Sequence, residues 1–443
     1  MGNLATPLSV QKLQTALHAK AKEDPSFRFY TLYDKLYRAD VLQYAYACCK
    51  ANKGAAGVDE VRFEDIEAYG LERWLGELAQ ELRIKKYKPQ AVRRVFIPKQ
   101  GGRGLRPLSI PTIRDRVAQT AAKTVLEPII EADLPPEQHG YRPGRDALTA
   151  VNQVHSLLTS GHTQVIDADL AAYFDTVPHS ELLTCVARRV VDRHVLHLIK
   201  MWLEVPVEES DERDRKRRTT RNRDEKRGIP QGSPLSPLLS NLYMRRFVVG
   251  WKHLGYAQRF GAQIVTYADD LVICCKHGAT EALPVLRQMM TRLKLTVNEE
   301  KTHVRRIPAE HFDFLGYTFG RVYSPKTGRA YVGTRPSKKS VHRMIARISE
   351  HTYRSTTWQD ADTVVRELNR MLLGWANYFR LGSVSKAYRV INRHTTHRLG
   401  RWLCKKHKIR GRGTVRYSRE YLHHRLGLLD VQTLMQRLPW AKA

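Results

Sequence analysis

One stretch of ten residues constrains this chain more than any other. It runs Ile264-Val-Thr-Tyr-Ala-Asp-Asp-Leu-Val-Ile273, so that two adjacent carboxylates, Asp269 and Asp270, separate two short apolar runs rich in β-branched residues. Such runs are typical of strands, and so short a polar interruption predicts the tight turn of a hairpin. Carboxylates at a buried edge repel each other unless a cation joins them. Mg²⁺, which takes oxygen ligands, suits this tip; a solvated acidic turn is the simpler alternative.

A third carboxylate stands at the end of another predicted strand. Val165 and Ile166 indicate a buried strand, and Asp169 would lie near its end. Three carboxylates on adjacent strands suit a pair of divalent ions that activate an attacking hydroxyl and stabilise a leaving phosphate oxygen. The sequence therefore predicts a phosphoryl-transfer site with Asp169, Asp269 and Asp270 as its metal ligands.

The net charge indicates a polyanionic partner. The 443 residues carry a formal charge of +31, and a hydrophobic content of 42% supports globular folding. Self-repulsion of this size disfavours a compact state, so RNA or DNA is the expected partner, with a merely soluble, highly charged surface as the alternative. We expect no membrane span, because no apolar run approaches about 18 residues, and the N-terminus lacks the order of a secretion signal.

Cysteine spacing and chain order complete the outline. The six cysteines include no Cys-x-x-Cys pair, which favours core residues in a reducing compartment over a zinc site.

Helical spacing covers about 8–50, and two strand-like runs, at 95–97 and 108–110, flank a glycine-rich basic tip. That tip carries Lys99, Arg103 and Arg106, and it either reaches over a polyphosphate or forms a solvated basic turn.

The C-terminal third is helical and basic. Helical spacing from 341 to 399 with short connections predicts an antiparallel bundle. From Arg401 onward there are eleven Lys or Arg against two acids, with Trp402, Tyr417 and Tyr421 among them, a mixture that suits a nucleic-acid surface. We predict a helical N-terminal extension (1–60), a catalytic region (61–320), a helical domain (335–400) and a basic tail (401–443).

The order of these blocks resembles that of the reverse transcriptase/maturases encoded in group II introns. The likeness covers roughly residues 50–400, and the order of the blocks is far more specific than any single block. The matching blocks are Gly54–Asp59, Ile97-Pro-Lys99, Arg106–Pro111, Asp169–Asp175, Pro230–Pro237, Tyr267–Asp270, Phe314–Tyr317 and, for the maturase helices, Leu368–Phe379.

The resemblance implies a fold and a set of roles. It implies an α+β right-hand polymerase, with fingers, a palm built on an antiparallel sheet and a helical thumb. Asp169 and Asp269, assisted by Asp270, would hold two Mg²⁺ ions, which Mn²⁺ can replace. Residues implied to contact the dNTP are Lys99, Arg106 (or Arg103, since the tip is a residue longer than usual), Gln231 and Phe174, the last as a steric gate against a 2′-hydroxyl. Cations expected to contact nucleic acid are Arg114, Arg116, Arg142, Arg145, Lys338, Lys339, Lys405, Lys406, Arg410 and Arg412.

The implied function is RNA-directed DNA synthesis combined with splicing of an intron. The expected partners are a group II intron RNA, an RNA template with a DNA primer, a DNA target and dNTP, with the protein acting as a monomer or dimer in the bacterial cytoplasm. We expect no zinc-bearing nuclease module after the basic tail. In this respect the chain resembles the shorter, endonuclease-lacking lineage of these proteins. The alternatives are a domesticated or defence-associated reverse transcriptase and an RNA-binding splicing factor whose polymerase site is idle.

Overall fold

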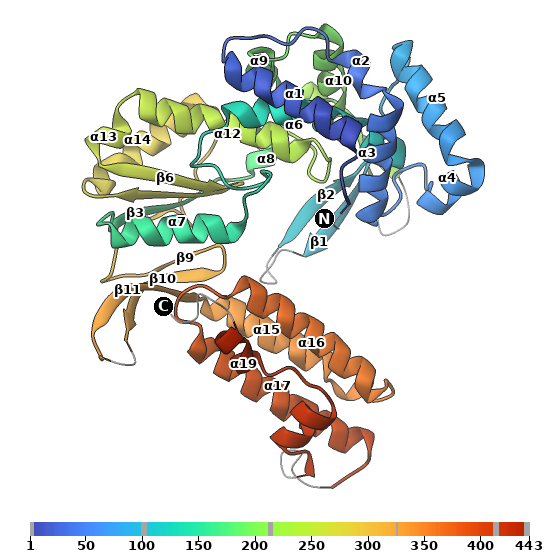
Figure 1. Cartoon of the computed structure of the whole chain (residues 1–443). Helices are drawn as coiled ribbons and strands as arrows, with labels where there is room; N and C mark the ends of the chain where they lie inside the picture. The colour runs from blue at the N-terminus through green and yellow to red at the C-terminus, as the bar shows by residue number, and fades with distance from the viewer. Residues whose placement is uncertain (1–3, 99–103, 211–215, 325–326, 411–415, 438–443) are drawn as a thin grey trace.

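The structure, a computed structural model, describes residues 4–98, 104–210, 216–324, 327–410 and 416–437. Figure 1 shows an upper mixed α/β part, which holds the described chain through residue 306, and a lower helical part, which holds it from residue 338 onward. Three strands, β9 to β11, lie between them. Within the described ranges no helix combines the length and the apolar character needed to cross a membrane.

The central sheet has four antiparallel strands in the order β6-β7-β3-β8. Its strands are β3 (Gln164–Asp169), β6 (Ala262–Tyr267), β7 (Asp270–Cys275) and β8 (His303–Arg306). Alternate side chains enter different cores: Val165 and Val272 face one cluster, whereas Ile166 and Ile273 face the main one. Both faces are covered, which explains why these strands are almost continuously apolar rather than alternating.

Helices and a small sheet cover the two faces of the central sheet. On one side lie α7 (Ala147–Thr159) and a three-stranded sheet in the order β11-β10-β9. On the other lie α12 (Ser236–His253) and α14 (Ala279–Arg292), as Figure 1 shows. The strands of the small sheet are β9 (Phe312–Phe314), β10 (Tyr317–Tyr323) and β11 (Ala330–Pro336). Short elements around this core are α8 (Tyr173–Thr176), α9 (His179–Ala187), α10 (Arg193–Leu203), α11 (Arg221–Asp224) and α13 (Tyr256–Arg259).

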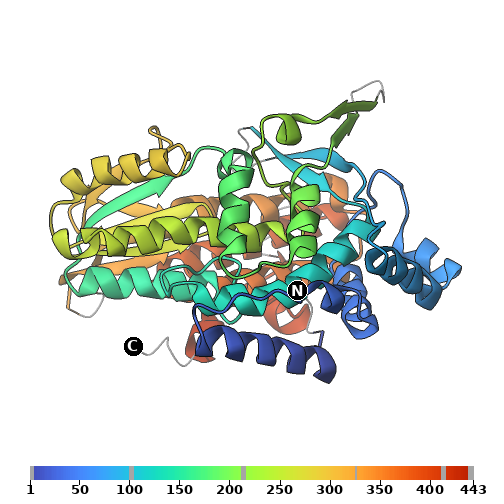
Figure 2. The same cartoon turned by 90° about the horizontal axis from the view of Figure 1, so that it is seen from above.

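The predicted helical N-terminal segment is present and packs onto a buried helix. Helices α1 (Leu8–Glu23) and α3 (Ala39–Ala51) lie against α6 (Ile113–Asp133), which is buried along most of its length. Figure 2 shows α1 running along the outside of this assembly. Between them come α2 (Tyr33–Leu36), α4 (Phe63–Tyr69) and α5 (Leu71–Arg83). The extension is therefore part of the main core and not a separate arm.

One hairpin of a second sheet projects from the upper part toward the helical part (Figure 1). Its order is β2-β1-β4-β5, with β1 and β4 parallel and the other pairs antiparallel. The strands are β1 (Val92–Pro98), β2 (Leu105–Ile110), β4 (Val207–Ser210) and β5 (Lys216–Thr219). The predicted β1–β2 hairpin is confirmed, and its tip, which carries Lys99 and Arg103, lies outside the described residues.

The C-terminal helical unit joins the predicted bundle and the predicted tail in one core. It contains α15 (Lys338–His351), η1 (Arg354–Thr356), α16 (Ala361–Tyr378), α17 (Ser385–Lys406), η2 (Tyr421–Arg425) and α19 (Val431–Arg437). Helix α17 crosses the boundary predicted at 400. Trp402 and Tyr417, predicted on a nucleic-acid surface, are 1% and 9% exposed and pack in this core, so that prediction is wrong for both.

Candidate active site

The three predicted carboxylates lie together at one edge of the central sheet. Asp169 ends β3 and Asp270 begins β7, and the antiparallel register places these two residues directly opposite each other. Directly opposed residues in such a pair have Cβ atoms about 4.5–5.5 Å apart. Asp269 stands in the two-residue turn between β6 and β7, next to Asp270. The predicted hairpin and the convergence of its acids with the third carboxylate are confirmed.

The turn that carries Asp269 is held from behind by the segment 137–140. The backbone N–H of His139 donates to the carbonyl of Thr266 at 2.9 Å, which extends the sheet by one short bridge. Gly140 then packs so closely on the turn that a Cβ there would lie 2.4 Å from the backbone nitrogen of Ala268. Ala268 itself has φ of +59°, a conformation that a hairpin turn of this length requires and that alanine adopts at some cost.

Helix α12 fixes the segment 137–140 in turn. The side-chain amide of Asn241 donates to the carbonyl of Gly140 at 2.6 Å, and Gln138 Nε2 donates to the carbonyl of Asn241 at 3.0 Å. Gln138 and Asn241 are both buried. Arg142 and Arg145, later in the same loop, were expected to contact nucleic acid; the residues that begin the loop instead hold the hairpin that carries Asp269.

The surroundings of Asp270 disfavour its ionised form. Although its side chain reaches solvent, desolvation by the surrounding protein and the charges of Asp269 and Asp169 raise its pKa to about 6. Asp167, two residues before Asp169 on the same face of β3, is also affected. Burial, with Asp270 as the next cause, raises the pKa of Asp167 to about 7. Clustered acids with raised pKa values are typical of sites that bind a cation.

Two further residues, which the sequence analysis did not single out, neutralise and orient Asp169. Lys301 Nζ lies 2.9 Å from Asp169 Oδ2, and Asn298 Nδ2 donates to the same oxygen at 3.1 Å. The backbone N–H of Asn298 also donates to the Asp169 carbonyl at 2.8 Å. Asp167 was detectable from its period-two spacing with Asp169. Lys301, 132 positions away, gave no local signal.

The donor set fits a hard divalent cation by its chemistry. Carboxylate oxygens are the ligands that Mg²⁺ takes, and a cation would relieve the repulsion that raises the pKa of Asp270. In the described part of the chain, no three His, Cys, Asp or Glu side chains are already closed around one point in the manner of a metal site. The ammonium of Lys301 instead balances Asp169, so the acids are gathered at one edge but are not arranged as a finished coordination shell.

Of the predicted triphosphate contacts, Arg106 is the one whose position the structure gives. It stands exposed on β2 opposite Ile97. Its charge lowers the pKa of Asp270 and of Tyr141, so its guanidinium lies on the side of the acids. Lys99, like Arg103, lies outside the described residues. Tyr141, which is 47% exposed, is a further neighbour of the acids: burial and then the charge of Asp269 raise its pKa.

Phe174 and Gln231 are brought together by backbone hydrogen bonds. The Ile229 N–H donates to the Phe174 carbonyl at 2.7 Å, and the Ser109 N–H donates to the Gln231 carbonyl at 2.6 Å. Gly232, with φ of +107°, packs against the Ser109 carbonyl, where a Cβ would lie at 2.5 Å. The half-buried Phe174 follows the Asp169 strand, and the turn containing Gln231 rests on the strand that carries Arg106.

Several predicted nucleic-acid contacts have internal partners instead. Arg116 and Arg142 are 8% and 7% exposed; Arg116 donates to the Ala55 carbonyl at 2.7 Å, and Arg142 forms a fork with Glu131. Lys406 donates to the carbonyl of Gln359 at 2.8 Å. We reassign Arg116, Arg142 and Lys406 to structural roles.

The remaining predicted contacts differ in how accessible they are. Arg114 pairs with Glu81, and Arg145 donates to the Pro136 carbonyl at 2.6 Å. Four cations stay exposed, namely Lys338, Lys339, Lys405 and Arg410. Arg412 lies outside the described residues.

Comparison with known families agrees with this geometry. The profile of the family described as "Reverse transcriptase (RNA-dependent DNA polymerase)" matches residues 97–319, which contain the three acids, Phe174 and Gln231. This chain belongs to the reverse transcriptase family. A second profile, "Group II intron, maturase-specific domain", matches residues 341–420 of this reverse transcriptase. It is an RNA-dependent DNA polymerase with a maturase domain.

Relatives of this reverse transcriptase include both bacterial and fungal proteins. Protein YkfC of Escherichia coli K12 is 32% identical over 369 residues, covering 75% of this chain and 93% of YkfC. The group II intron-encoded protein LtrA of Lactococcus lactis subsp. cremoris is 30% identical over 216 residues, covering 49% of this chain and 34% of LtrA. The putative COX1/OXI3 intron 1 protein of Saccharomyces cerevisiae is 24% identical over 428 residues, covering 79% of this chain and 50% of the yeast protein. The chain thus spans about a third of LtrA and about half of the yeast intron 1 protein.

Proposed function

We propose that this reverse transcriptase joins a primer 3′-hydroxyl to a dNTP at the edge formed by Asp169, Asp269 and Asp270. The observation that carries the proposal is the register that sets Asp169 opposite Asp270 with Asp269 in the adjoining turn. These carboxylates would hold two Mg²⁺ ions, for which Mn²⁺ can substitute. When bound, such ions lower the pKa of the attacking hydroxyl and stabilise the leaving oxygen. The central sheet would then be the palm of a right-hand polymerase.

The protein's own residues would mostly position substrates and neutralise charge, as phosphoryl transfer requires. Arg106, exposed and close enough to the acids to lower the pKa of Asp270, would bind the triphosphate of the incoming nucleotide. Lys99 on the same hairpin would share this role, and the hairpin would belong to the fingers. The ring of Phe174 would exclude a ribose 2′-hydroxyl, and Gln231, on the adjoining turn, would contact the nucleotide.

Asp269 and Asp270 must stay ionised to serve as ligands. Burial and then the charges of Asp269 and Asp169 raise the pKa of Asp270, so the ionised form is disfavoured at this edge, and Lys301 offsets part of the repulsion at Asp169. We propose that Lys301 and Asn298 hold Asp169 ready for the cations. The held carboxylate would keep its orientation before the ions arrive, which shortens the rearrangement needed for catalysis.

We further propose that the protein binds a group II intron RNA, assists its splicing and supports its return to DNA. The match of the maturase-specific domain to residues 341–420 supports this, as does the net charge of +31. The C-terminal helical unit would act as the thumb and, with α1 to α3, offer basic surface to the RNA. Because phosphate contacts release counterions, RNA affinity should fall steeply with salt; a flat response between low and moderate salt would remove this account of the charge.

Primer extension on poly(rA)/oligo(dT) with Mg²⁺ tests the catalytic proposal. Asp269→Ala should abolish extension, because a ligand is lost, while RNA affinity changes by less than about twofold, since the basic surfaces remain. Asp34→Ala removes an exposed carboxylate on α2 and is the matched control, expected to extend at the wild-type rate. Extension by the Asp269 variant would refute the site. Equal loss of extension and RNA binding would refute the division of roles.

A further inference from the structure

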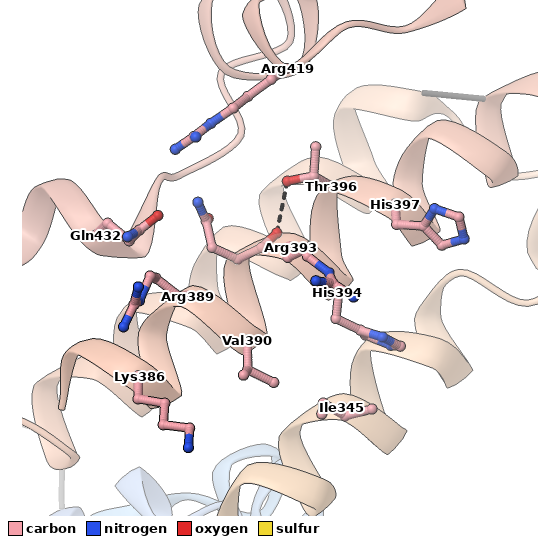
Figure 3. Close-up of a pocket in the computed structure, with 11 residues that line it drawn as sticks. Ile345, Lys386, Arg389, Val390, Arg393, His394, Thr396, His397, Arg419 and Gln432 are labelled. Atoms are coloured by element: carbon pink, nitrogen blue, oxygen red, sulfur yellow. Dashed lines mark hydrogen bonds between the residues drawn. The ribbon is translucent and has the colours of Figure 1, made fainter. Parts of the chain in front are cut away.

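The C-terminal helical unit contains a basic recess away from the acidic site. It is a cavity of about 1250 Å³ between α17, α15 and the end of the chain. Figure 3 shows the side chains that surround it. Most of the charged ones come from α17, and Arg419 and Gln432 close the opposite wall. None of the residues proposed for catalysis lines it.

The far wall is held in place by a short polar chain. Asn392 Nδ2 on α17 donates to Asp430 Oδ1 at 2.9 Å, and the other oxygen of Asp430 pairs with Arg419. Asn392 is 4% exposed. The recess therefore exists only because the segment after α17 folds back on that helix, and Arg419 faces the space across from α17 (Figure 3).

Two stripes of different chemistry run along α17 into the recess. Arg389, Arg393 and His397 follow one another at four-residue spacing and so share one face of the helix. Lys386, Val390 and His394 form the neighbouring stripe at the same spacing. Figure 3 shows His394 and Val390 on the side of Ile345 of α15, and Arg389 on the side of Gln432.

The first stripe is positively charged and uncompensated. Among the described residues, neither Arg389 nor Arg393 forms an ion pair, nor does Lys386 on the neighbouring stripe, and Asp430 is already engaged by Arg419. Residues four apart on a helix are about 6 Å apart along its axis, so Arg389 and Arg393 can bind neighbouring phosphate groups of one nucleic-acid strand. Guanidinium groups bind phosphate through paired hydrogen bonds, which makes this stripe suited to a phosphodiester backbone.

The second stripe is largely apolar and uncharged beyond Lys386. Val390 is 43% exposed, so its side chain can be reached from the recess. Burial and the nearby Arg398 lower the pKa of His394, so its ring is neutral, and the ring is fixed by a 3.0 Å hydrogen bond with Ser349. A neutral aromatic ring next to Val390 and Ile345 offers a surface on which a nucleobase can stack.

We propose that this recess binds one unpaired nucleotide extruded from an RNA, with its flanking phosphates on Arg389 and Arg393 and its base against Val390 and His394. The inference deepens the proposed RNA partnership and rests on it. A concave site of this kind favours a bulge or loop, because the phosphates of a regular duplex lie on a convex cylinder and reach only the rim. Bulged and looped bases are also the segments that proteins read in RNA.

The experiment measures binding of the full-length protein to a hairpin RNA with a single bulged uridine and to the same hairpin without the bulge. Fluorescence anisotropy over a range of salt gives the affinity and its salt slope. We expect the wild type to prefer the bulged hairpin about tenfold. Arg389→Ala/Arg393→Ala should remove the preference and reduce the salt slope for the bulged RNA by about 1.4, the value for two single-strand phosphate contacts.

Two further variants separate the recess from general effects of charge and folding. Lys276→Ala/Arg292→Ala removes two exposed cations, one directly after β7 and one at the end of α14, which do not line the recess, and this variant should keep the preference. Val390→Asp changes an exposed position, where we expect the fold to be kept, and this variant should lose the preference. Each variant is compared with the wild type by circular dichroism and thermal unfolding.

The outcomes decide the inference without using polymerase activity, so its failure is distinguishable from a failure of the catalytic proposal. Loss of the preference in both recess variants, with the control unchanged, supports it. A wild type that binds both hairpins equally overturns it, as does a preference that survives in the recess variants. Equal affinity for a DNA hairpin with one bulged thymidine overturns the assignment to RNA.

Discussion

Gly140 gives the sharpest test of how the hairpin that carries Asp269 is positioned. A methyl group at this position would lie 2.4 Å from the Ala268 nitrogen and 3.1 Å from the Tyr267 carbonyl carbon. Favourable van der Waals contacts between non-bonded heavy atoms begin at about 3.5 Å. Gly140→Ala therefore requires the turn, or the segment behind it, to move by about 1 Å. The segment is tied to α12 through Asn241, so the turn is the part that yields.

The expected result is a slow enzyme that still folds and binds. A displacement of about 1 Å in a catalytic group costs on the order of 100-fold in rate. Overpacking of this size costs about 1–3 kcal/mol in the free energy of unfolding. Single-turnover primer extension should therefore slow about 100-fold. The affinity for the primer and template should change by less than about twofold, because Asp269 and Asp270 move while the basic surfaces do not.

The matched control is Gly76→Ala. Gly76 lies within α5, and a Cβ there meets nothing within 4 Å. Alanine is the better helix former by about 0.5–1 kcal/mol, so this variant should be slightly more stable and fully active. A Gly140→Ala enzyme that extends at the wild-type rate would refute the reasoning. So would a Gly140→Ala enzyme whose loss of rate is matched by an equal loss of folded protein.

Three other changes probe the substrate gate and two buried polar contacts. Phe174→Val should let the enzyme incorporate rNTP at least about tenfold more readily relative to dNTP, measured by competition in primer extension; unchanged discrimination would place Phe174 in the core alone. Asp192→Asn should lower the free energy of unfolding by about 3 kcal/mol, measured by denaturant titration. The Asp192 carboxylate accepts hydrogen bonds from four backbone N–H groups, including those of Leu32 and Tyr33, and the amide of asparagine cannot accept all four. Burial alone would raise the pKa of Asp192, but these donors hold it below its usual range, so the stabilisation is complete above about pH 4 and is lost as the pH falls through the lowered pKa. Tyr388→Phe removes the one hydroxyl proton that lies between the carbonyls of Ala376 and Phe379, and it should cost about 1–2 kcal/mol in the same titration. No change would show that this shared hydrogen bond contributes nothing net.

The pairing of distant cations and acids could not be predicted from sequence. Arg116 and Arg142 look like Arg410 in a sequence, yet two are buried and one is exposed. What separates them is whether carbonyls and carboxylates from other segments meet the guanidinium, as Glu131 meets Arg142. The same limit applied to aromatic residues. Trp402, interpreted as a stacking residue because cations surround it, is 1% exposed in the core.

The sequence by itself determined the chemistry and the local elements of the site. Short apolar runs rich in β-branched residues predict strands, and a polar interruption of two residues predicts a hairpin, so the sequence alone assigns Asp269 and Asp270 to a hairpin tip and Asp169 to a strand end. Their closeness required only that the two strands pair, which the central sheet confirms.

Only the tertiary structure decided what surrounds those acids. The contact of Gly140 with the turn, the ion pair between Lys301 and Asp169, and the closure of the basic recess by Arg419 all join segments that are far apart in the chain or packed through backbone atoms. Propensity and periodicity act over about a dozen residues. Packing, desolvation and charge pairing depend on which distant groups arrive at the same place, and that is settled when the chain has folded.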